Sequence, residues 1–339
     1  MTSTPVDALS RIAYLLERGR EPSYRVKAFR NAASAIRDLS DEELTERALA
    51  QKLRELPGVG EVTERVILET LAGERSSYLV RLEEEQTGAV ATGGEAIRTA
   101  LRGDCHTHSD WSDGGSPILE MAETARSLGH EYLVLTDHSG RLKVAKGLDR
   151  ERLMRQLEVV ASLNEALAPF RILTGMEVDI LEDGSLDMGD EVLSQLDVVV
   201  GSLHSKLRME EPAQTRRMVR ALADPNLDIL GHCTGRLVVG RGRPESTFDP
   251  ELVFEAALRF DKAVEINSRP ERLDPPRRLL RMVVERGCRV SIDTDAHAPG
   301  QLDWLPYGCS RAAECGVPVD RIVNTMDADG LLAWTSSHD

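Results

Sequence analysis

The sequence predicts a protein of the α/β class, a closed barrel of parallel strands preceded by a small all-α domain. From residue 101 onward, short apolar runs alternate seven times with amphipathic stretches of ten or more residues. This alternation favours a closed parallel barrel, and an open doubly wound sheet is the alternative. Residues 7–86 carry only helical periodicity, and small residues follow at 87–94. We therefore expect a helical domain at 1–86, a linker at 87–100 and the barrel at 101–339.

The helices expected in the first domain share apolar positions three and four residues apart. They are 7–39, interrupted at Gly19–Pro22, 42–55, 61–72 and 76–85. The strands expected in the second domain are short runs rich in apolar residues. They are 101–105, 131–136, 171–178, 197–203, 227–231, 262–267 and 288–293.

Composition excludes several classes of protein. With 41% hydrophobic and 29% charged residues, the chain is neither disordered nor collagen-like. No apolar run approaches the ~20 residues of a membrane span, and the N-terminus has no signal-peptide pattern. The five cysteines form no C-x-x-C pair, which argues against a disulfide framework and a cysteine zinc site. We expect a cytoplasmic protein without a membrane partner.

The net charge of −15 is unevenly distributed along the chain. Residues 1–100 carry −3 and the remaining residues −12, whereas residues 1–40 alone carry +3. An acidic surface repels long nucleic acid, so the charge argues against a protein that coats DNA. It is compatible with an enzyme that meets DNA at its N-terminal end.

Polar residues gather at the ends of the predicted strands. They are His106, His108, Asp137, His138, Glu177, His204, His232, Glu265, Asn267, Asp295 and His297. In a parallel barrel these side chains all lie at the C-terminal face, where such barrels hold their active sites. Six of the eight histidines belong to this set. Isolated core or surface histidines do not explain such a concentration.

This set of residues predicts a metal site. Imidazole and carboxylate together suit zinc, manganese or iron, and so many ligands imply a cluster of two or three ions. His106 and His108 can aim both rings at one ion, because alternate residues of a strand share a side. Glu177 is the candidate for a carboxylate that bridges two ions.

Seven motifs at these strand ends resemble the PHP (polymerase and histidinol phosphatase) domain family. They are His106-Thr-His-Ser-Asp-Trp-Ser-Asp-Gly114, Thr136-Asp-His138, Gly175-Met-Glu177, Ser202-Leu-His204-Ser205, Ile229-Leu-Gly-His232, Glu265-Ile-Asn267 and Thr294-Asp-Ala-His297. Residues 232–236 and 265–274 further resemble the PHP module of bacterial family X DNA polymerases. The resemblance spans about 101–335 and implies a distorted (β/α)7 TIM-like barrel with a trinuclear metal site.

Carried over residue by residue, the resemblance implies three divalent ions of zinc, manganese or iron. The implied ligands are His106, His108, Glu177 and Asp295 for one ion, Glu177, His204 and His232 for the second, and Asp113, His138 and His297 for the third. Some PHP members have histidine where Asp113 stands. Because every ligand position is filled by a competent residue, we expect an active site rather than an inert scaffold.

A cluster of this kind activates water to hydroxide and binds phosphoryl oxygens, which indicates hydrolysis of a phosphate ester. Glu177 and Asp295 are the expected catalytic carboxylates. Arg236 and Arg269, just past strand ends, are expected to clamp phosphate oxygens. Asp104 and Asp137 are candidates for orienting the histidine ligands.

The first domain contains a motif for phosphate binding by the backbone. Leu56-Pro57-Gly58-Val59-Gly60 matches the helix-hairpin-helix pattern, in which glycine lets the backbone approach a phosphate closely. Residues 22–33 also resemble the first helices of the family X polymerase N-terminal domain. Glu61 and Glu64 on the following helix oppose phosphate binding. The residues expected to contact DNA are Gly58, Val59, Gly60, Arg25, Lys27 and Arg30.

In a family X polymerase, a palm with paired aspartates lies between these two modules. Only the linker at 87–100 stands in that place, so we expect no polymerase activity. The expected function is a metal-dependent phosphodiesterase acting on DNA, either a 3′–5′ exonuclease or a 3′-end-processing or abasic-site repair nuclease. One alternative is a small-molecule phosphomonoesterase of the histidinol phosphatase type. The other is a noncatalytic DNA-binding scaffold in which metals only stabilise the barrel.

Overall fold

The computed structural model describes residues 4–338, so the ends of the expected domains at 1–3 and 339 lie outside the described residues. The chain divides into two compact units, the first ending at Ala89 and the second beginning at Val90. Within residues 4–338, no helix combines the length and the apolar character that crossing a bilayer requires.

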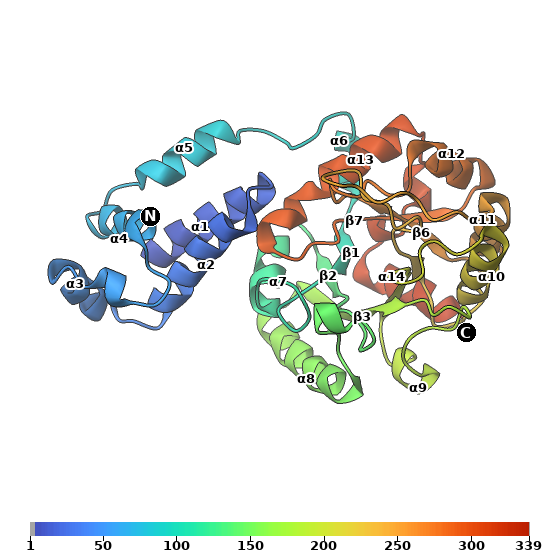
Figure 1. Cartoon of the computed structure of the whole chain (residues 1–339), viewed down its shortest axis with the longest axis horizontal. Helices are drawn as coiled ribbons and strands as arrows, with labels where there is room; N and C mark the ends of the chain where they lie inside the picture. The colour runs from blue at the N-terminus through green and yellow to red at the C-terminus, as the bar shows by residue number, and fades with distance from the viewer. Residues whose placement is uncertain (1–3, 339) are drawn as a thin grey trace. The chain divides into compact units, whose positions relative to one another are not determined.

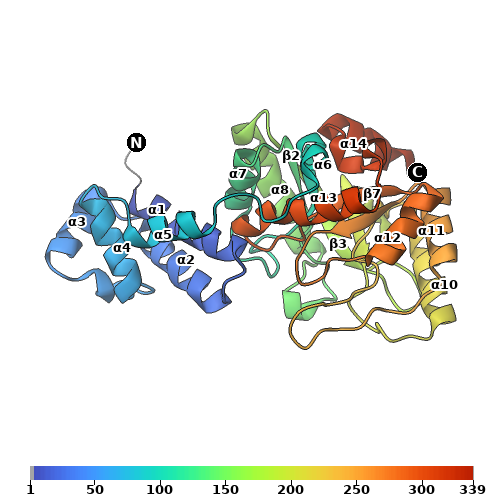
Figure 2. The same ribbon diagram turned by 90° about the horizontal axis from the view of Figure 1, so that it is seen from above.

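The first unit is entirely helical. Its helices are α1 (Pro5–Arg18), α2 (Ser23–Arg37), α3 (Asp41–Leu49), α4 (Glu61–Leu71) and α5 (Ser77–Glu85). Helices α1 and α2 lie side by side in both views (Figures 1 and 2), and their apolar faces supply much of the core, including Leu9, Leu16 and Phe29. The single helix expected over 42–55 is instead α3 followed by a 3-10 turn at Leu53–Glu55. Gln51, with a φ of 58°, separates the two.

The helix-hairpin-helix turn lies between this 3-10 turn and α4. Gly58 has a φ of +88°, and a Cβ atom there would lie 2.9 Å from the Cβ of Asn31 in α2. Both the left-handed backbone and the close approach therefore require glycine. Val59 is buried in the core of the unit. The Gly60 N–H donates a hydrogen bond to Thr63 Oγ1 at 2.9 Å, which caps α4.

The second unit is a nearly closed barrel of seven parallel strands. They are β1 (Gly103–Thr107), β2 (Tyr132–Leu135), β3 (Arg171–Asp179), β4 (Val198–Ser202), β5 (Ile229–Leu230), β6 (Ala263–Asn267) and β7 (Arg289–Asp293). Each strand pairs with the next along the chain. The two ends of the sheet meet where Thr107 pairs with Ala296, and the His108 N–H donates to the Ala296 carbonyl at 2.8 Å. The predicted fold class is confirmed.

Helices connect the strands and cover the barrel. They are α6 (Glu95–Ala100), α7 (Ile118–Ser127), α8 (Arg150–Leu167), α9 (Asp190–Leu193), α10 (Glu211–Leu222), α11 (Pro250–Arg259), α12 (Arg277–Arg286), α13 (Leu305–Glu314) and α14 (Ala328–Thr335). Figure 1 shows α7, α8, α10, α11 and α12 around the strands. Ile97 of α6 and Leu101 are buried in the core of this unit. Residues 95–100 are therefore part of the barrel unit, and not of the linker expected at 87–100.

Candidate metal centre

Every predicted ligand lies at the C-terminal end of a barrel strand or in the loop that follows it. They are His106 in β1, His108 and Asp113 after β1, His138 after β2, Glu177 in β3, His204 after β4, His232 after β5, and Asp295 and His297 after β7. The strands are parallel and adjacent, so their C-terminal ends open on the same face. The fold thus brings together side chains that are up to 191 residues apart in the sequence.

Glu177 lies at the centre of five imidazole rings, and we call this group the Glu177 cluster. Its Oε2 faces three rings and its Oε1 faces two. The distances to the nearest ring nitrogens are 3.3 Å for His106, 3.6 Å for His108 and 2.9 Å for His138 from Oε2, and 3.2 Å for His204 and 2.9 Å for His232 from Oε1. A carboxylate with several ligands around each oxygen has the arrangement of a bridge between metal ions.

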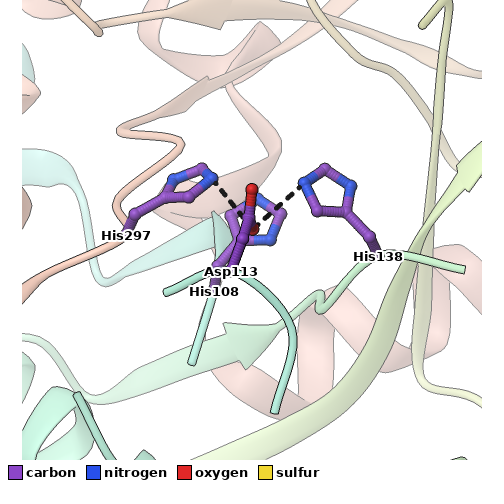
Figure 3. A group of neighbouring side chains, drawn as sticks. All are labelled: His108, Asp113, His138 and His297. Carbon is purple, nitrogen blue, oxygen red and sulfur yellow. Dashed lines mark ion pairs between the residues drawn. The ribbon is translucent and has the colours of Figure 1, made fainter. Parts of the chain in front are cut away.

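Asp113 forms a second group beside this cluster. Figure 3 shows Asp113 between the rings of His138 and His297, with His108 close by. Asp113 Oδ1 lies 3.4 Å from the Nε2 atoms of both His138 and His297. One ligand atom from each of the four residues lies within 4.8 Å of the others, so together they could hold one ion.

Asp295 connects the two groups. Its Oδ1 lies 3.5 Å from His108 Nε2 and 3.5 Å from His297 Nδ1. Arg272 Nε donates to its Oδ2 at 3.1 Å. The φ of Asp295 is +53°, a left-handed conformation that costs energy for a residue with a side chain and persists where surrounding contacts impose it.

Four overlapping groups of residues in this face could each hold a cation. They are His108, Asp113, His138 and His297; His106, Glu177 and His232; His106, His108 and Asp295; and His138, Glu177 and His204. All nine predicted ligands are included. The grouping differs from the sets implied by the family resemblance, because His108 also meets Asp113, and His138 also meets Glu177 and His204.

The residues present fit divalent cations on chemical grounds. Several buried ligand atoms make no hydrogen bond within residues 4–338, among them Glu177 Oε2, both ring nitrogens of His108 and His204, and His106 Nε2. Buried polar atoms in proteins are almost always paired, so these atoms require partners of another kind. Imidazole nitrogens and carboxylate oxygens are the donors that zinc, manganese and iron accept.

Electrostatics hold Glu177 and His108 in the protonation states that bind cations, whereas, although burial opposes it, Glu177 raises the pKa of His106 and His138. Burial opposes the charge of Glu177, but the rings of His204, His106 and His138 outweigh it and hold the pKa of the carboxyl well below its usual range. Burial, together with the neighbouring rings of His297 and His138, lowers the pKa of His108 well below its usual value. Glu177 is therefore ionised and His108 neutral, as metal ligands must be.

Glu265 orients one ligand from β6. His106 Nδ1 lies 2.7 Å from Glu265 Oε1, which fixes the ring and leaves Nε2 directed at Glu177. We also expected Asp104 and Asp137 to orient histidine rings, and this expectation is wrong, because other groups donate to both carboxylates. Asp104 accepts hydrogen bonds from the His106 backbone N–H at 3.2 Å and from the Thr294 hydroxyl at 2.5 Å. Asp137 accepts from two serine hydroxyls and a glutamine amide.

A cavity of about 530 Å³ opens beside the cluster, and three arginines line it. Arg269, one of the two predicted phosphate-binding arginines, is among them. Its Nη1 lies 3.6 Å from Asp295 Oδ1. Arg243 and Arg272 line the same cavity but were not predicted. Arg272 lies three residues after Arg269, in the stretch that follows β6. This closeness in the sequence could have indicated that Arg272 lies at the same site.

Arg236 does not line this cavity among the described residues. Its guanidinium donates to the carbonyl oxygens of Arg272, at 3.0 Å from Nε, and of Leu273, and it lies 3.4 Å from Glu245. Its hydrogen-bonding capacity is thus used to hold the loop that carries Arg272. We do not retain the expected phosphate contact for Arg236.

The structure separates the six residues expected to contact DNA. Arg30 forms a two-pronged ion pair with the buried Glu17, with both N–O distances at 2.9 Å. Arg25 pairs with Glu21 and donates to Tyr78 Oη at 2.7 Å. Together with the burial of Val59, these contacts assign structural roles to half of the set.

The other three predicted residues, Gly58, Gly60 and Lys27, are exposed. Gly58 borders a shallow pocket of about 400 Å³ that also includes Asn31 and Ser34 of α2. Glu64, which the sequence placed against phosphate binding, is paired with Arg54 at 2.5 Å. Its charge is therefore partly compensated.

We expect Arg30→Met to destabilise the first unit without weakening DNA binding directly. Removing one partner of a mostly buried ion pair leaves Glu17 uncompensated, at a cost of about 3 kcal/mol. Hydrogen exchange of α1 and α2 measures this loss. Lys27→Met is the matched control, because Lys27 is exposed on the same helix. Normal exchange protection in Arg30→Met would contradict the structural role.

The two remaining histidines lie away from the cluster. His130 is buried against Arg98, at 3.3 Å from Nη2, and burial followed by the Arg98 charge lowers its pKa to about 3. His338 Nδ1 lies 2.8 Å from Asp228 Oδ1. All five cysteines are buried free thiols.

The barrel and its buried face of histidines and carboxylates define the class of protein, a metal-dependent phosphoesterase. Residues 104–267 match the PHP domain model and residues 3–76 match a helix-hairpin-helix domain model. The chain contains a PHP domain, with a helix-hairpin-helix domain ahead of it in the sequence.

The curated relatives that this chain resembles include a DNA polymerase with exonuclease activity in its name and probable phosphatases. The chain is 38% identical over 239 residues to a DNA polymerase/3′-5′ exonuclease PolX of Bacillus subtilis, covering 70% of this chain and 42% of that protein. The chain thus spans about two-fifths of the length of that relative. It is 29% identical over 235 residues to a probable phosphatase of Thermoanaerobacter, covering 66% of this chain and 89% of the relative.

Among solved structures, a histidinol phosphate phosphatase from Lactococcus lactis, complexed with zinc, L-histidinol and phosphate, matches with a TM-score of 0.42 and 18% identity. The match covers 64% of this chain and 94% of that chain.

Proposed function

We propose that the chain is a metal-dependent phosphodiesterase acting on DNA, either a 3′–5′ exonuclease or a 3′-end-processing or abasic-site repair nuclease. The observation that carries the proposal is the Glu177 cluster beside a cavity lined by Arg243, Arg269 and Arg272. Carboxylates and imidazoles bind cations, and guanidinium groups bind phosphate. The helix-hairpin-helix domain and the likeness to PolX support DNA as the substrate.

We propose that the nine ligands hold three divalent ions of zinc, manganese or iron, with Glu177 shared between ions. Asp113 would serve the group with His138 and His297, and Asp295 would lie between the groups. When bound, such ions lower the pKa of a coordinated water and polarise phosphoryl oxygens. Six of the nine ligands are buried, whereas Asp113, His204 and His297 are partly or fully exposed where they line the cavity.

The arginines of the cavity supply the positive charge for the substrate. Arg272 is held by Asp295 through Nε at 3.1 Å, and its Nη1 is a buried donor without a hydrogen-bond partner within residues 4–338. A phosphoryl oxygen is the acceptor that this donor lacks. Arg269, at the same wall, would bind a second oxygen of the phosphate and stabilise its charge in the transition state.

In the first unit, the proposed contacts to DNA are Gly58 and Gly60 of the hairpin and Lys27 of α2. The hairpin backbone is open to solvent, and a Cβ at Gly60 would meet no atom within 4 Å, so a phosphate can approach it. Lys27 would contact a neighbouring phosphate as a point charge.

A second candidate function is hydrolysis of a small phosphomonoester, for which the same ligands and arginines would serve. The observation in its favour is the match to a probable phosphatase along 89% of that relative. It leaves the helix-hairpin-helix domain unexplained. A noncatalytic scaffold leaves unexplained why all nine ligand positions remain filled and adjacent.

The proposed function predicts Mn²⁺-stimulated degradation of a short DNA oligonucleotide that His108→Ala abolishes. His108 belongs to two of the four groups, so its loss removes a ligand from both. His338→Ala is the matched control, because that histidine pairs with Asp228 outside the cluster. An intact rate of DNA degradation in His108→Ala would contradict the proposal.

A further inference from the structure

We infer that two loops at the mouth of the cavity form a binding surface for single-stranded DNA, which delivers its phosphate to the Glu177 cluster. We call residues 139–148 and 236–243 the mouth loops. The first follows β2 and the second follows β5. This inference rests on the proposed function and specifies its substrate: a polynucleotide strand that extends out of the cavity, rather than a small ester enclosed within it.

The mouth loops border the same cavity as the metal ligands. The first contributes Leu142, Val144 and Ala145, and the second contributes Leu237, Val239, Gly240 and Arg243. Asp113, His138, His204, Asp295 and His297 line the same cavity. A strand that reaches the cluster through this cavity therefore passes between the two loops.

Apolar side chains at the tips of both loops are exposed to solvent. Val144 is 91% exposed, Val238 49% and Val239 46%. Exposed apolar side chains that border a functional cavity mark a surface that another molecule covers. The faces of nucleobases and the carbon atoms of deoxyribose are apolar groups that would cover them.

Both loops are held in place by hydrogen bonds, so these valines are not exposed by a lack of order. In the first loop, Ser139 pairs with Leu148, and Arg152 Nη1 donates to the Lys146 carbonyl at 2.6 Å. In the second, Leu237 pairs with Arg243. The Val238 N–H donates to the Glu271 carbonyl at 2.7 Å and attaches this loop to the wall of the cavity. A preformed surface binds without an ordering penalty.

The charge of the mouth loops is opposite to that of the unit that carries them. Residues 139–148 contain Arg141, Lys143 and Lys146 and no acidic residue. Residues 236–243 contain Arg241 and Arg243 beside Arg236, which pairs with Glu245, and no acidic residue. The chain beyond residue 100 has a net charge of −12. Glu271 at the cavity wall pairs with Arg269 at 3.6 Å, and Asp187 accepts from the Arg141 N–H of the first loop at 3.0 Å.

Basic and apolar side chains alternate along the first loop, as Arg141-Leu-Lys-Val-Ala-Lys146. Surfaces that bind single-stranded nucleic acid combine basic side chains for the phosphates with side chains, most often aromatic ones, on which the bases stack. In the first loop, Leu142 and Val144 would take the second role. A small phosphomonoester with its phosphate at the cluster needs neither the exposed valines nor several cations. The combination therefore favours a polynucleotide.

The test uses the full chain and a double variant of the first loop, Lys143→Glu with Val144→Asp. The matched control makes the same kinds of change on the opposite face of the barrel, Leu258→Asp with Arg259→Glu. Leu258 is 40% exposed and Arg259 is the last residue of α11, which precedes the start of β6 at Ala263. The quantities compared are kcat/KM for a ten-residue oligothymidylate and for bis(p-nitrophenyl) phosphate, both with Mn²⁺.

We expect the ratio of the oligothymidylate to the small-diester kcat/KM to fall at least tenfold in the mouth-loop variant and less than twofold in the control. The dependence of log kcat/KM on log salt concentration should weaken by about 0.7 for each DNA phosphate that the variant no longer neutralises. An unchanged ratio in the mouth-loop variant overturns the inference. An equal loss for the oligothymidylate and for bis(p-nitrophenyl) phosphate leaves the ratio unchanged in this way, and it would show that the loops bind small aromatic esters.

A binding measurement separates this inference from the proposed function. In the Glu177→Gln background, fluorescence anisotropy of labelled oligothymidylate reports binding without cleavage. We expect the mouth-loop changes to weaken this binding at least fivefold, and the control changes to leave it as it was. If the parent chain hydrolyses no DNA, the proposed function fails. If the mouth-loop changes leave anisotropy binding unaltered, the inference fails.

Discussion

Glu177→Gln is expected to reduce phosphodiester hydrolysis by at least about 1000-fold and to lower the metal content of the purified protein. Glutamine keeps the shape of the side chain but replaces a shared anionic oxygen by an amide that cannot bridge two cations. Five imidazoles face this one carboxylate, and its loss would remove a ligand from both of the candidate ion sites that contain it. Steady-state kinetics with Mn²⁺ and elemental analysis measure the two effects.

Glu182→Gln is the matched control, because Glu182 lies five residues further along and its side chain is 64% exposed beside Lys206. It should retain both metal and activity. Retention of full activity by Glu177→Gln would mean that hydrolysis does not use this cluster. Loss of activity with the metal content unchanged would assign Glu177 to the substrate rather than to the ions.

Arg272→Met is expected to lower kcat/KM by about 100-fold, the size of effect found when one donor to a developing phosphoryl or oxyanion charge is removed. The guanidinium lies between Asp295 and the cavity, and one of its donors is buried without a partner among the described residues. Arg272→Lys should recover only part of the loss, because lysine keeps the charge but not the two-pronged geometry. The measurement is kcat/KM on an oligonucleotide.

Arg236→Met provides the contrast. The Arg236 guanidinium binds the carbonyl oxygens of Arg272 and Leu273, so its loss should lower the melting temperature. Its effect on kcat/KM should be much smaller than that of Arg272→Met. A hundredfold loss in Arg236→Met with normal activity in Arg272→Met would reverse the assignment.

The barrel and the convergence of its ligands could be predicted from the sequence because both follow from a short-range pattern. Each strand is a run of apolar residues, and each ligand lies at the end of such a run, as His138 does after β2 and Glu177 at the end of β3. A parallel barrel brings strand ends to one face whatever the details of packing. The positions of these side chains along the chain were therefore sufficient.

The direction in which a loop side chain points cannot be predicted from such a short-range pattern. Arg236 follows β5 and Arg272 follows β6, but of the two only Arg272 lines the cavity, whereas the Arg236 guanidinium binds the Arg272 carbonyl. In the first unit, Arg30 belongs to a basic stretch, yet it packs inward against Glu17 from the preceding helix. The choice in each case depends on a partner distant in the sequence.

The central claim, a metal-dependent phosphodiesterase for DNA, is tested most directly by one substrate comparison. Metal-free protein is titrated with Mn²⁺, and the release of nucleoside 5′-monophosphates from a single-stranded oligonucleotide is measured beside the release of phosphate from phosphomonoesters, including histidinol phosphate. We predict that nucleotide release requires Mn²⁺, saturates near three ions per chain and exceeds monoester turnover. Rapid monoester turnover without any cleavage of DNA would contradict the account.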